Sequence, residues 1–200
     1  MKEFLNRMNY VRGNILRKKM LLVPVLLFVS AFSYGQTLES FGVSAGPSFF
    51  TGPYYNTYYP GGSLGVVFNL STPVQMISIR LGAVYSLHDG KTITYVTEQN
   101  GVEYINPVEH EETQLLSLAV SVKYGRTTGP YLFIGPTGNR FTYQSDFTFG
   151  FEAGAGWILN RKMKGPRIHI TLRHNALNLL KKDTEKREVG IVLVMFGLIW

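Results

Sequence analysis

The last segment of the chain is a long apolar strand. From Val189 to Trp200 it carries no charged residue, and apolar side chains occupy every second position before the final tryptophan. A chain end normally frays into water, and a long apolar strand with an unpaired edge is an aggregation hazard. A closed barrel, in which the last strand pairs with the first, removes that edge. The tail therefore predicts a β-barrel.

The alternating positions at this end resemble the C-terminal signal of bacterial outer-membrane barrels. The residues that carry the resemblance are Val194, Phe196, Leu198 and Trp200. The resemblance implies recognition by the barrel-assembly machinery and contact with outer-membrane lipid.

The first 35 residues have the organisation of a secretory signal peptide. Six basic residues and one acidic residue precede an apolar run from Met20 to Phe32, and the stretch Ser33–Gln36 follows. At about 13 residues the run is shorter than the roughly 20 that a spanning helix needs. We therefore expect residues 1–35 to be a signal peptide, cleaved after Gly35, and residues 36–200 to form the mature domain. An uncleaved N-terminal membrane anchor is the alternative.

Removal of the leader changes the charge argument. The whole chain has a net charge of +7, of which the leader supplies +5, so the mature domain is near +2. Nucleic-acid binding needs a basic stripe on the folded domain, and we do not expect it here. The chain contains no cysteine. This excludes disulfides and metal sites built on thiolates.

Alternation of apolar with small or polar residues predicts eight strands in the mature domain. Their approximate ranges are 39–50, 62–71, 76–88, 113–124, 130–138, 146–158, 166–175 and 188–200. Four of them, 76–88, 113–124, 146–158 and 166–175, have one apolar face and one small or polar face, as in the wall of a transmembrane barrel. We therefore expect an all-β fold, an eight-stranded antiparallel transmembrane barrel. The last strand is apolar on both faces, which predicts that part of the lumen is packed and dry.

Six of the seven connections between these strands alternate in length. The long ones are 51–61, 89–112 and 176–187, the short ones are 72–75, 125–129 and 159–165, and the remaining connection, 139–145, fits neither group. Outer-membrane barrels have short periplasmic turns and longer outer loops, so both termini are expected in the periplasm. Within 89–112, Asn100-Gly101 lies between two alternating segments and predicts a hairpin that projects beyond the membrane.

Six stretches resemble the PorT-like outer-membrane β-barrel family of Bacteroidota. They are residues 80–85, 114–124, 129–136, 150–156, 173–179 and the aromatic-ended tail. The chain departs from the family at 115–117, where Leu-Leu-Ser stands in place of the usual Glu and Pro. The resemblance implies a small barrel in the outer membrane. Through some relatives it also implies a link to protein secretion or gliding machinery.

The inner faces of the predicted strands contribute a cluster of ionisable residues. Its members are Arg80, Lys123, Glu152, His169 and Arg173. Unpaired buried charges are costly, so these groups must be paired or wetted. A polar plug that closes a narrow barrel is one interpretation. An anion-selective pore or gate is the other.

The first long loop carries four tyrosines. They are Tyr54, Tyr55, Tyr58 and Tyr59. Tyrosine supplies contact area and a hydroxyl, so the loop predicts a platform for a glycan, a peptide or an envelope protein partner. The alternative is part of the aromatic girdle at a membrane surface.

Signals for catalysis are weak. The chain has no His-x-x-x-His spacing. His110 lies among three glutamates, a combination that can hold a divalent cation or simply form a solvated acidic loop. We expect no catalytic residue, cofactor or metal site. The predicted function is that of a non-enzymatic scaffold or partner-binding barrel, and the alternatives are a narrow small-solute pore and a soluble, lipocalin-like periplasmic barrel.

Overall fold

The computed structural model describes residues 37–52, 54–99, 102–142, 147–159, 165–177 and 189–200. The predicted signal peptide lies outside these residues. Their elements are β1 (Leu38–Thr51), α2 (Tyr54–Thr57), β2 (Gly61–Ser71), β3 (Ile77–His88), β4 (Thr92–Gln99), β5 (Val102–Glu109), β6 (Thr113–Gly125), β7 (Gly129–Phe141), β8 (Phe147–Ile158), β9 (Arg167–Ala176) and β10 (Gly190–Ile199). Within these ranges no helix is long and apolar enough to cross a membrane.

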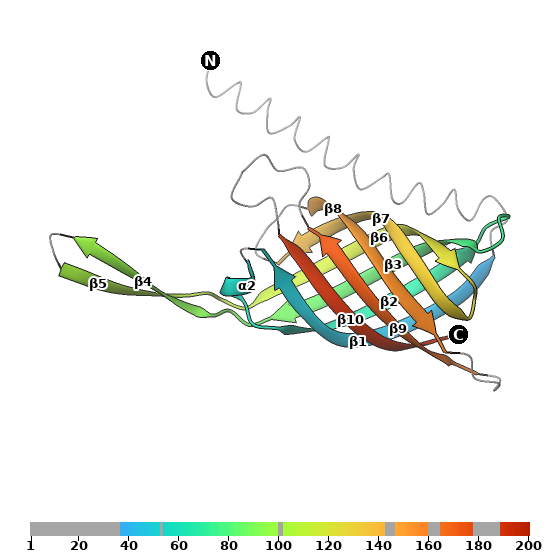
Figure 1. Ribbon diagram of the computed structural model, residues 1–200, viewed down its shortest axis with the longest axis horizontal. Helices are drawn as coiled ribbons and strands as arrows, with labels where there is room; N and C mark the ends of the chain where they lie inside the picture. The colour runs from blue at the N-terminus through green and yellow to red at the C-terminus, as the bar shows by residue number, and fades with distance from the viewer. Residues whose placement is uncertain (1–36, 53, 100–101, 143–146, 160–164, 178–188) are drawn as a thin grey trace, which may run out of the picture. The chain divides into compact units, whose positions relative to one another are not determined.

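Eight of the strands form a closed antiparallel barrel. Around the barrel the order is β1, β2, β3, β6, β7, β8, β9 and β10, and β4 and β5 form a separate two-stranded ribbon (Figure 1). Closure comes from pairing of β10 with β1, where the backbone N–H groups of Phe41 and Trp200 each donate to the other residue's carbonyl, at 3.1 and 2.8 Å. The predicted all-β fold, the closed eight-stranded antiparallel barrel and the pairing of the first and last strands are confirmed.

The predicted strand boundaries are confirmed within two residues, with one exception. Strand β7 continues to Phe141, whereas the sequence pattern placed its end at 138. The extension keeps the alternation of the strand, because Asn139 and Phe141 both point inward and are buried. The hairpin expected within 89–112 is the β4–β5 ribbon.

The two ends of the barrel differ. The start of β1, the ends of β8 and β10, the start of β9 and the connections 72–76 and 126–128 lie at one end, which we call the turn end. Segment α2 and the base of the ribbon lie at the other, the loop end (Figure 1). Gly125 and Gly129 flank a tight turn with φ of 146° and 98°, a backbone region that favours glycine.

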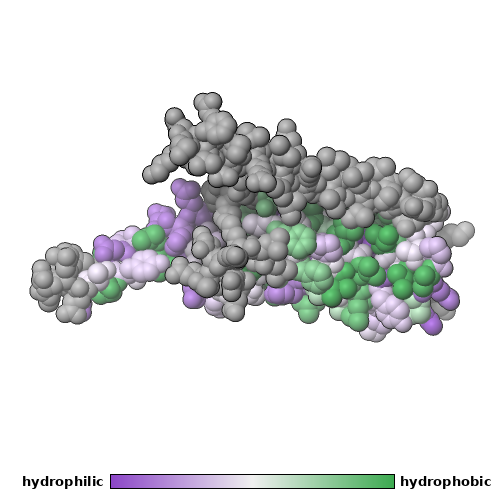
Figure 2. Space-filling view, turned by 90° about the horizontal axis from the view of Figure 1, so that it is seen from above, coloured by the Kyte–Doolittle hydropathy of each residue, from purple (hydrophilic) through white to green (hydrophobic). Residues whose placement is uncertain are grey.

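The outer surface of the barrel is apolar. Figure 2 shows hydrophobic residues gathered over the barrel strands. Exposed large side chains on these strands include Val43, Phe49, Leu64, Val66, Phe68, Tyr85, Leu87, Leu116, Leu118, Val122, Tyr124, Leu132, Ile134, Phe147, Phe149, Phe151, Trp157, Ile170, Leu172, Phe196 and Leu198. Aromatic residues mark both ends of this surface. Phe41, Tyr124, Trp157 and Trp200 lie at the turn end, and Phe49, Tyr85 and Phe147 lie toward the loop end.

The interior is filled by side chains, and glycine lies opposite two of its aromatic rings. Tyr131 and Phe133 point inward from β7 and lie against Gly156 and Gly154 of the neighbouring strand β8. A Cβ atom added at either glycine would collide with the facing ring. This pairing of large with small residues lets a narrow barrel hold aromatic rings in its lumen.

Candidate functional site

The five ionisable residues predicted for the lumen are all buried in the barrel interior. They come from four strands, with Arg80 on β3, Lys123 on β6, Glu152 on β8, and His169 and Arg173 on β9. The structure divides them into a central group around Glu152 and a second group nearer the turn end.

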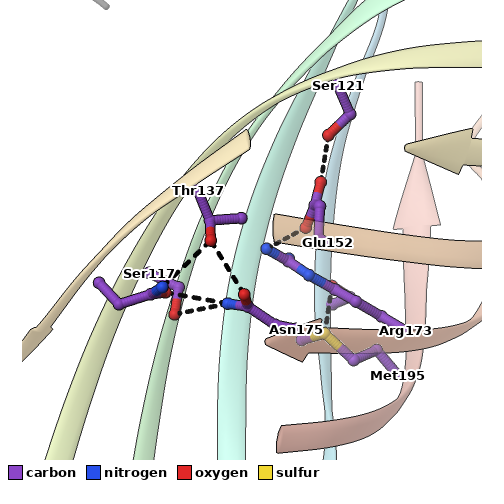
Figure 3. Close-up of polar contacts among 9 residues, drawn as sticks. Ser117, Ser121, Thr137, Glu152, Arg173, Asn175 and Met195 are labelled. Atoms are coloured by element: carbon purple, nitrogen blue, oxygen red, sulfur yellow. Dashed lines mark hydrogen bonds and ion pairs between the residues drawn. The ribbon is translucent and has the colours of Figure 1, made fainter. Parts of the chain in front are cut away.

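Glu152 is the centre of the first group. Its carboxylate accepts a hydrogen bond from the Ser121 hydroxyl of β6 and forms an ion pair with the Arg173 guanidinium of β9 (Figure 3). Both charged side chains are almost completely buried. The contacts therefore tie three strands together through the middle of the lumen.

Lys123 belongs to the second group, and its partner is a residue that sequence reasoning missed. The Lys123 Nζ lies 3.6 Å from Oε1 of Glu39. Simple alternation along β1 places residue 39 on the outer face, but the pairing of β1 with β2 shifts register between Leu38 and Ser40. Such a bulge re-aims a side chain. The bulge is therefore the feature that brings Glu39 to Lys123.

Arg80 lies against aromatic rings. Its Cζ is 4.4 Å from the ring centroid of Phe133 and 6.0 Å from that of Tyr131. The Lys123 Nζ is 5.4 Å from the Tyr131 centroid. Cation–π attraction is strongest where water is excluded, so these rings help to hold two cations inside the barrel.

His169 lies beside the same aromatic pair. The Tyr131 hydroxyl is 3.0 Å from the hydroxyl of Thr171, which in turn is 3.3 Å from Nδ1 of His169. Gly197 on β10 leaves space for the imidazole, since a Cβ there would lie 2.5 Å from Nε2. His169 is thus part of a polar chain within the lumen.

A neutral hydrogen-bond network lies between the ionic groups and the loop end. The Asn175 amide donates to Oδ1 of Asn139 at 2.9 Å and to the Ser117 hydroxyl at 3.3 Å, and the Thr137 hydroxyl donates to Oδ1 of Asn175 at 2.9 Å (Figure 3). Asn139 donates to Thr137 Oγ1 at 3.1 Å. Sequence reasoning missed this network because Asn139 lies beyond the strand end it assigned. Continuing the alternation to Phe141 would have included it.

An apolar cluster closes the interior at the loop end. Its buried members are Phe50, Val84, Leu115, Phe141, Leu177, Val189, Ile191, Leu193 and Met195. Three of them, Ile191, Leu193 and Met195, lie on the inner face of β10. The apolar character of both faces of that strand is explained by this packing.

The four predicted tyrosines separate into two pairs. The rings of Tyr54 and Tyr58 pack on Phe50, at centroid distances of 5.6 and 5.4 Å, and so cover the apolar cluster. Tyr55 and Tyr59 are 63% and 54% exposed. Of the four, only this second pair presents most of its surface to the outside.

Lys91 lies between the two exposed tyrosines. Its Nζ is 5.3 Å from the ring centroid of Tyr55 and 5.2 Å from that of Tyr59, and it donates to the Tyr55 carbonyl at 2.9 Å. His88 anchors the segment from below, with Nδ1 3.1 Å from the Tyr59 carbonyl and Nε2 3.1 Å from the Ser48 hydroxyl. The outer rings are therefore fixed in position around a cation.

The residues of the expected C-terminal signal lie on the outer surface. Phe196, Leu198 and Trp200 are exposed, and Val194 is half-buried. Trp200 stacks on Phe41 of the neighbouring strand with a centroid distance of 5.9 Å. The alternation that carries the resemblance thus forms part of the apolar exterior beside the closing seam.

Comparison with known proteins finds a likeness among solved structures and none among protein families. No protein-family model and no curated protein sequence matches the chain. Among solved structures, the chain is similar to Neisserial surface protein A (NspA), with 14% identity and a TM-score of 0.49, over 80% of this chain and 94% of that one. The assignment of a closed eight-stranded barrel rests on the strand pairings described above.

Proposed function

We propose that the chain is a non-enzymatic outer-membrane barrel with a closed lumen, which acts as a scaffold or binds an envelope protein through its loop end. The observation that carries this proposal is inverted polarity. Glu152, Arg173 and Lys123 are buried in the interior, whereas aromatic and aliphatic side chains such as Phe149 and Leu118 are exposed. A barrel that exposes its apolar face in this way is matched to hydrocarbon outside.

The limits of the apolar surface support the same proposal. The outward-facing Arg140 and His174 both lie near the loop end, on β7 and β9. The Arg140 guanidinium is 5.8 Å from the ring centroid of Phe147. Amphipathic aromatic rings and long basic side chains favour the boundary between lipid and water. Together with the aromatic residues at the turn end, they define a band of the kind that spans a bilayer.

The packed interior favours a scaffold over a pore. Ionic, amide and apolar groups follow one another along the lumen, and their side chains are buried. Eight strands leave an interior just wide enough for side chains to fill. A small-solute pore would need these contacts to break, and a soluble lipocalin-like barrel would need a polar exterior.

The proposal also covers how the protein reaches and sits in the membrane. We propose that a leader at residues 1–35 is removed, that both termini are periplasmic and that the barrel-assembly machinery recognises the chain. We also propose that the chain is a PorT-like barrel with a link to secretion or gliding machinery. The turn end carries both the start of β1 and the end of β10, which supports placing the two together on one side of the membrane.

Photo-cross-linking tests the membrane assignment with a matched pair of positions. Leu118 is exposed on the outer face of β6, and its neighbour Ser117 is buried in the lumen. A photoreactive side chain at 118, in protein folded into liposomes, should label acyl chains, and one at 117 should label protein. Equal lipid labelling at both positions, or none at 118, would contradict the proposal.

Conductance separates the scaffold from the pore. The refolded protein should show no current steps in planar bilayers. The control is a variant with Tyr131→Gly and Phe133→Gly, which removes two lumen rings and should conduct more than the natural chain. Steady current steps from the natural chain would favour the pore.

A further inference from the structure

The β4–β5 ribbon is the part of the described chain that lacks a second layer. It extends from the loop end as a two-stranded sheet (Figure 1). Apolar side chains are exposed on both of its faces, with Val96 opposite Ile105 on one and Tyr95 and Val108 on the other. An isolated pair of strands is marginally stable in water. We propose that the outer edge of β4 is a docking site for an extended, basic segment of a protein partner, which adds a third strand to the ribbon.

The hydrogen-bond pattern identifies which groups face the outer edges. The His110 N–H donates to the Lys91 carbonyl at 3.2 Å, and the Lys91 N–H donates to the Thr57 carbonyl at 2.8 Å, so residues 91 and 110 share a single bond that sets the phase of the ladder at the base of the ribbon. Bonded and non-bonded pairs alternate along an antiparallel ladder. The pairs Thr94–Pro107 and Val96–Ile105 are therefore non-bonded, and their backbone polar groups point away from the ribbon.

This pattern makes the two edges unequal. Along β4, Thr92, Thr94 and Val96 each present an N–H and a carbonyl to the outside. Along β5, Pro107 occupies one of the outward positions and has no N–H to offer. Proline is a known guard against strand addition at a sheet edge. An added strand can therefore form a continuous ladder with β4 and not with β5.

The charge of the ribbon specifies the partner. The strands of the ribbon contain three glutamates, Glu98, Glu103 and Glu109, and no lysine or arginine, and Glu111 and Glu112 follow β5. Glu103, Glu109, Glu111 and Glu112 are exposed. A second copy of the same ribbon would bring like charges together, whereas an extended segment rich in lysine or arginine would neutralise them. Backbone pairing gives such an interaction its affinity, and alternate side chains give it specificity.

The proposal rests on the proposed function only in placing the loop end outside the membrane. The test uses the full chain folded in detergent micelles and a fluorescein-labelled peptide about as long as β4, in which lysine alternates with valine. Binding is measured by fluorescence anisotropy. The same peptide with glutamate in place of lysine should bind at least about tenfold more weakly, and equal binding would overturn the proposal.

Two proline variants separate the edges. Val96 and Ile105 are directly opposite, are 62% and 68% exposed, and both direct their N–H outward. Val96→Pro should weaken peptide binding about tenfold or more, and Ile105→Pro should change it less than about twofold. Neither substitution removes a bond between β4 and β5. Equal losses in both variants, or a loss confined to Ile105→Pro, would refute docking on β4.

Amide exchange gives a readout that does not depend on a variant. Peptide binding should slow exchange at Thr94 and Val96 and leave Glu103 and Ile105 unchanged. A folded barrel that labels lipid but shows no such protection refutes the docking site and leaves the proposed function intact. Failure to label lipid, with protection of Thr94 and Val96 retained, refutes the membrane assignment alone.

Discussion

The barrel and the ribbon are both built from strands with period-2 alternation, but they differ in how many neighbours each strand has and in whether its faces are covered. In the barrel every strand has two neighbours and the closing pair is β1 with β10. In the ribbon each strand has one neighbour, and no layer covers either face within the described residues. A closed barrel thus needs enough strands to bring the first and last edges together, and side chains that fill the enclosed lumen.

The interiors show the same contrast. Barrel strands direct Glu152, Asn175 and Phe50 into one enclosed space, where polar groups bind each other and apolar groups pack. The ribbon has no enclosed side, and its Val96–Ile105 pair remains exposed. The difference indicates that the barrel carries the stability of the domain and the ribbon carries its capacity for contact.

The most severe way to break this contrast is to remove the closing strand. A chain that ends after Val194 loses the second half of β10 with Phe196, and Trp200 after it, and leaves two open edges. We expect complete loss of the folded, faster-migrating band in heat-modifiability gels. A folded band that persists would show that closure does not depend on this seam.

The next largest effect is expected from the central ion pair. Glu152→Gln keeps an acceptor for Ser121 but leaves Arg173 buried without its counter-charge. We expect the free energy of unfolding to fall by about 3–5 kcal/mol, measured by urea titration in lipid. Replacing both residues, by Glu152→Leu with Arg173→Met, should cost less than the single change. A larger loss in the double variant would contradict the pairing.

A smaller effect is expected from overfilling the lumen. In Gly154→Val the new side chain meets the Phe133 ring, and the free energy of unfolding should fall by about 1–3 kcal/mol. Gly62→Val is the matched control, because a Cβ there meets nothing within 4 Å. Equal destabilisation by both variants would show that the losses come from strand propensity and not from lumen packing.

The smallest effect is expected from removing the ribbon. A short glycine turn can replace residues 92–109, because the hydrogen bond between the His110 N–H and the Lys91 carbonyl remains to close the connection. The free energy of unfolding should change by less than about 0.5 kcal/mol, while binding of the basic peptide should disappear. A large loss of stability would mean that the ribbon supports the barrel after all.

Much of this fold could be predicted from the sequence because period-2 alternation repeats over every residue of a strand, so single departures do not hide it. In β6, for example, Leu116, Leu118 and Val122 point outward and Ser117, Ser121 and Lys123 point inward, as the pattern indicates. The alternating apolar residues of the C-terminal tail predicted barrel closure for the same reason. Each of these features depends on one strand alone.

The rest depends on contacts between segments that are distant in the sequence. The bulge that directs Glu39 to Lys123 arises from pairing between β1 and β2. The separation of Tyr54 and Tyr58 from Tyr55 and Tyr59 depends on Phe50 and Lys91. The unequal edges of the ribbon depend on which pairs are hydrogen-bonded. None of these is encoded in the local pattern of a single segment.

The seam between β1 and β10 has a consequence for the order of folding. Every other pair of barrel neighbours can form as a hairpin, but this seam joins Gly42 to Ile199 across nearly the whole described chain. Bringing such distant segments together requires a large loss of chain entropy before any contact is gained, and it slows folding. We therefore expect a curved, incomplete sheet to accumulate before the last ladder forms, and its lifetime to set how much of the protein aggregates on the way to the native state.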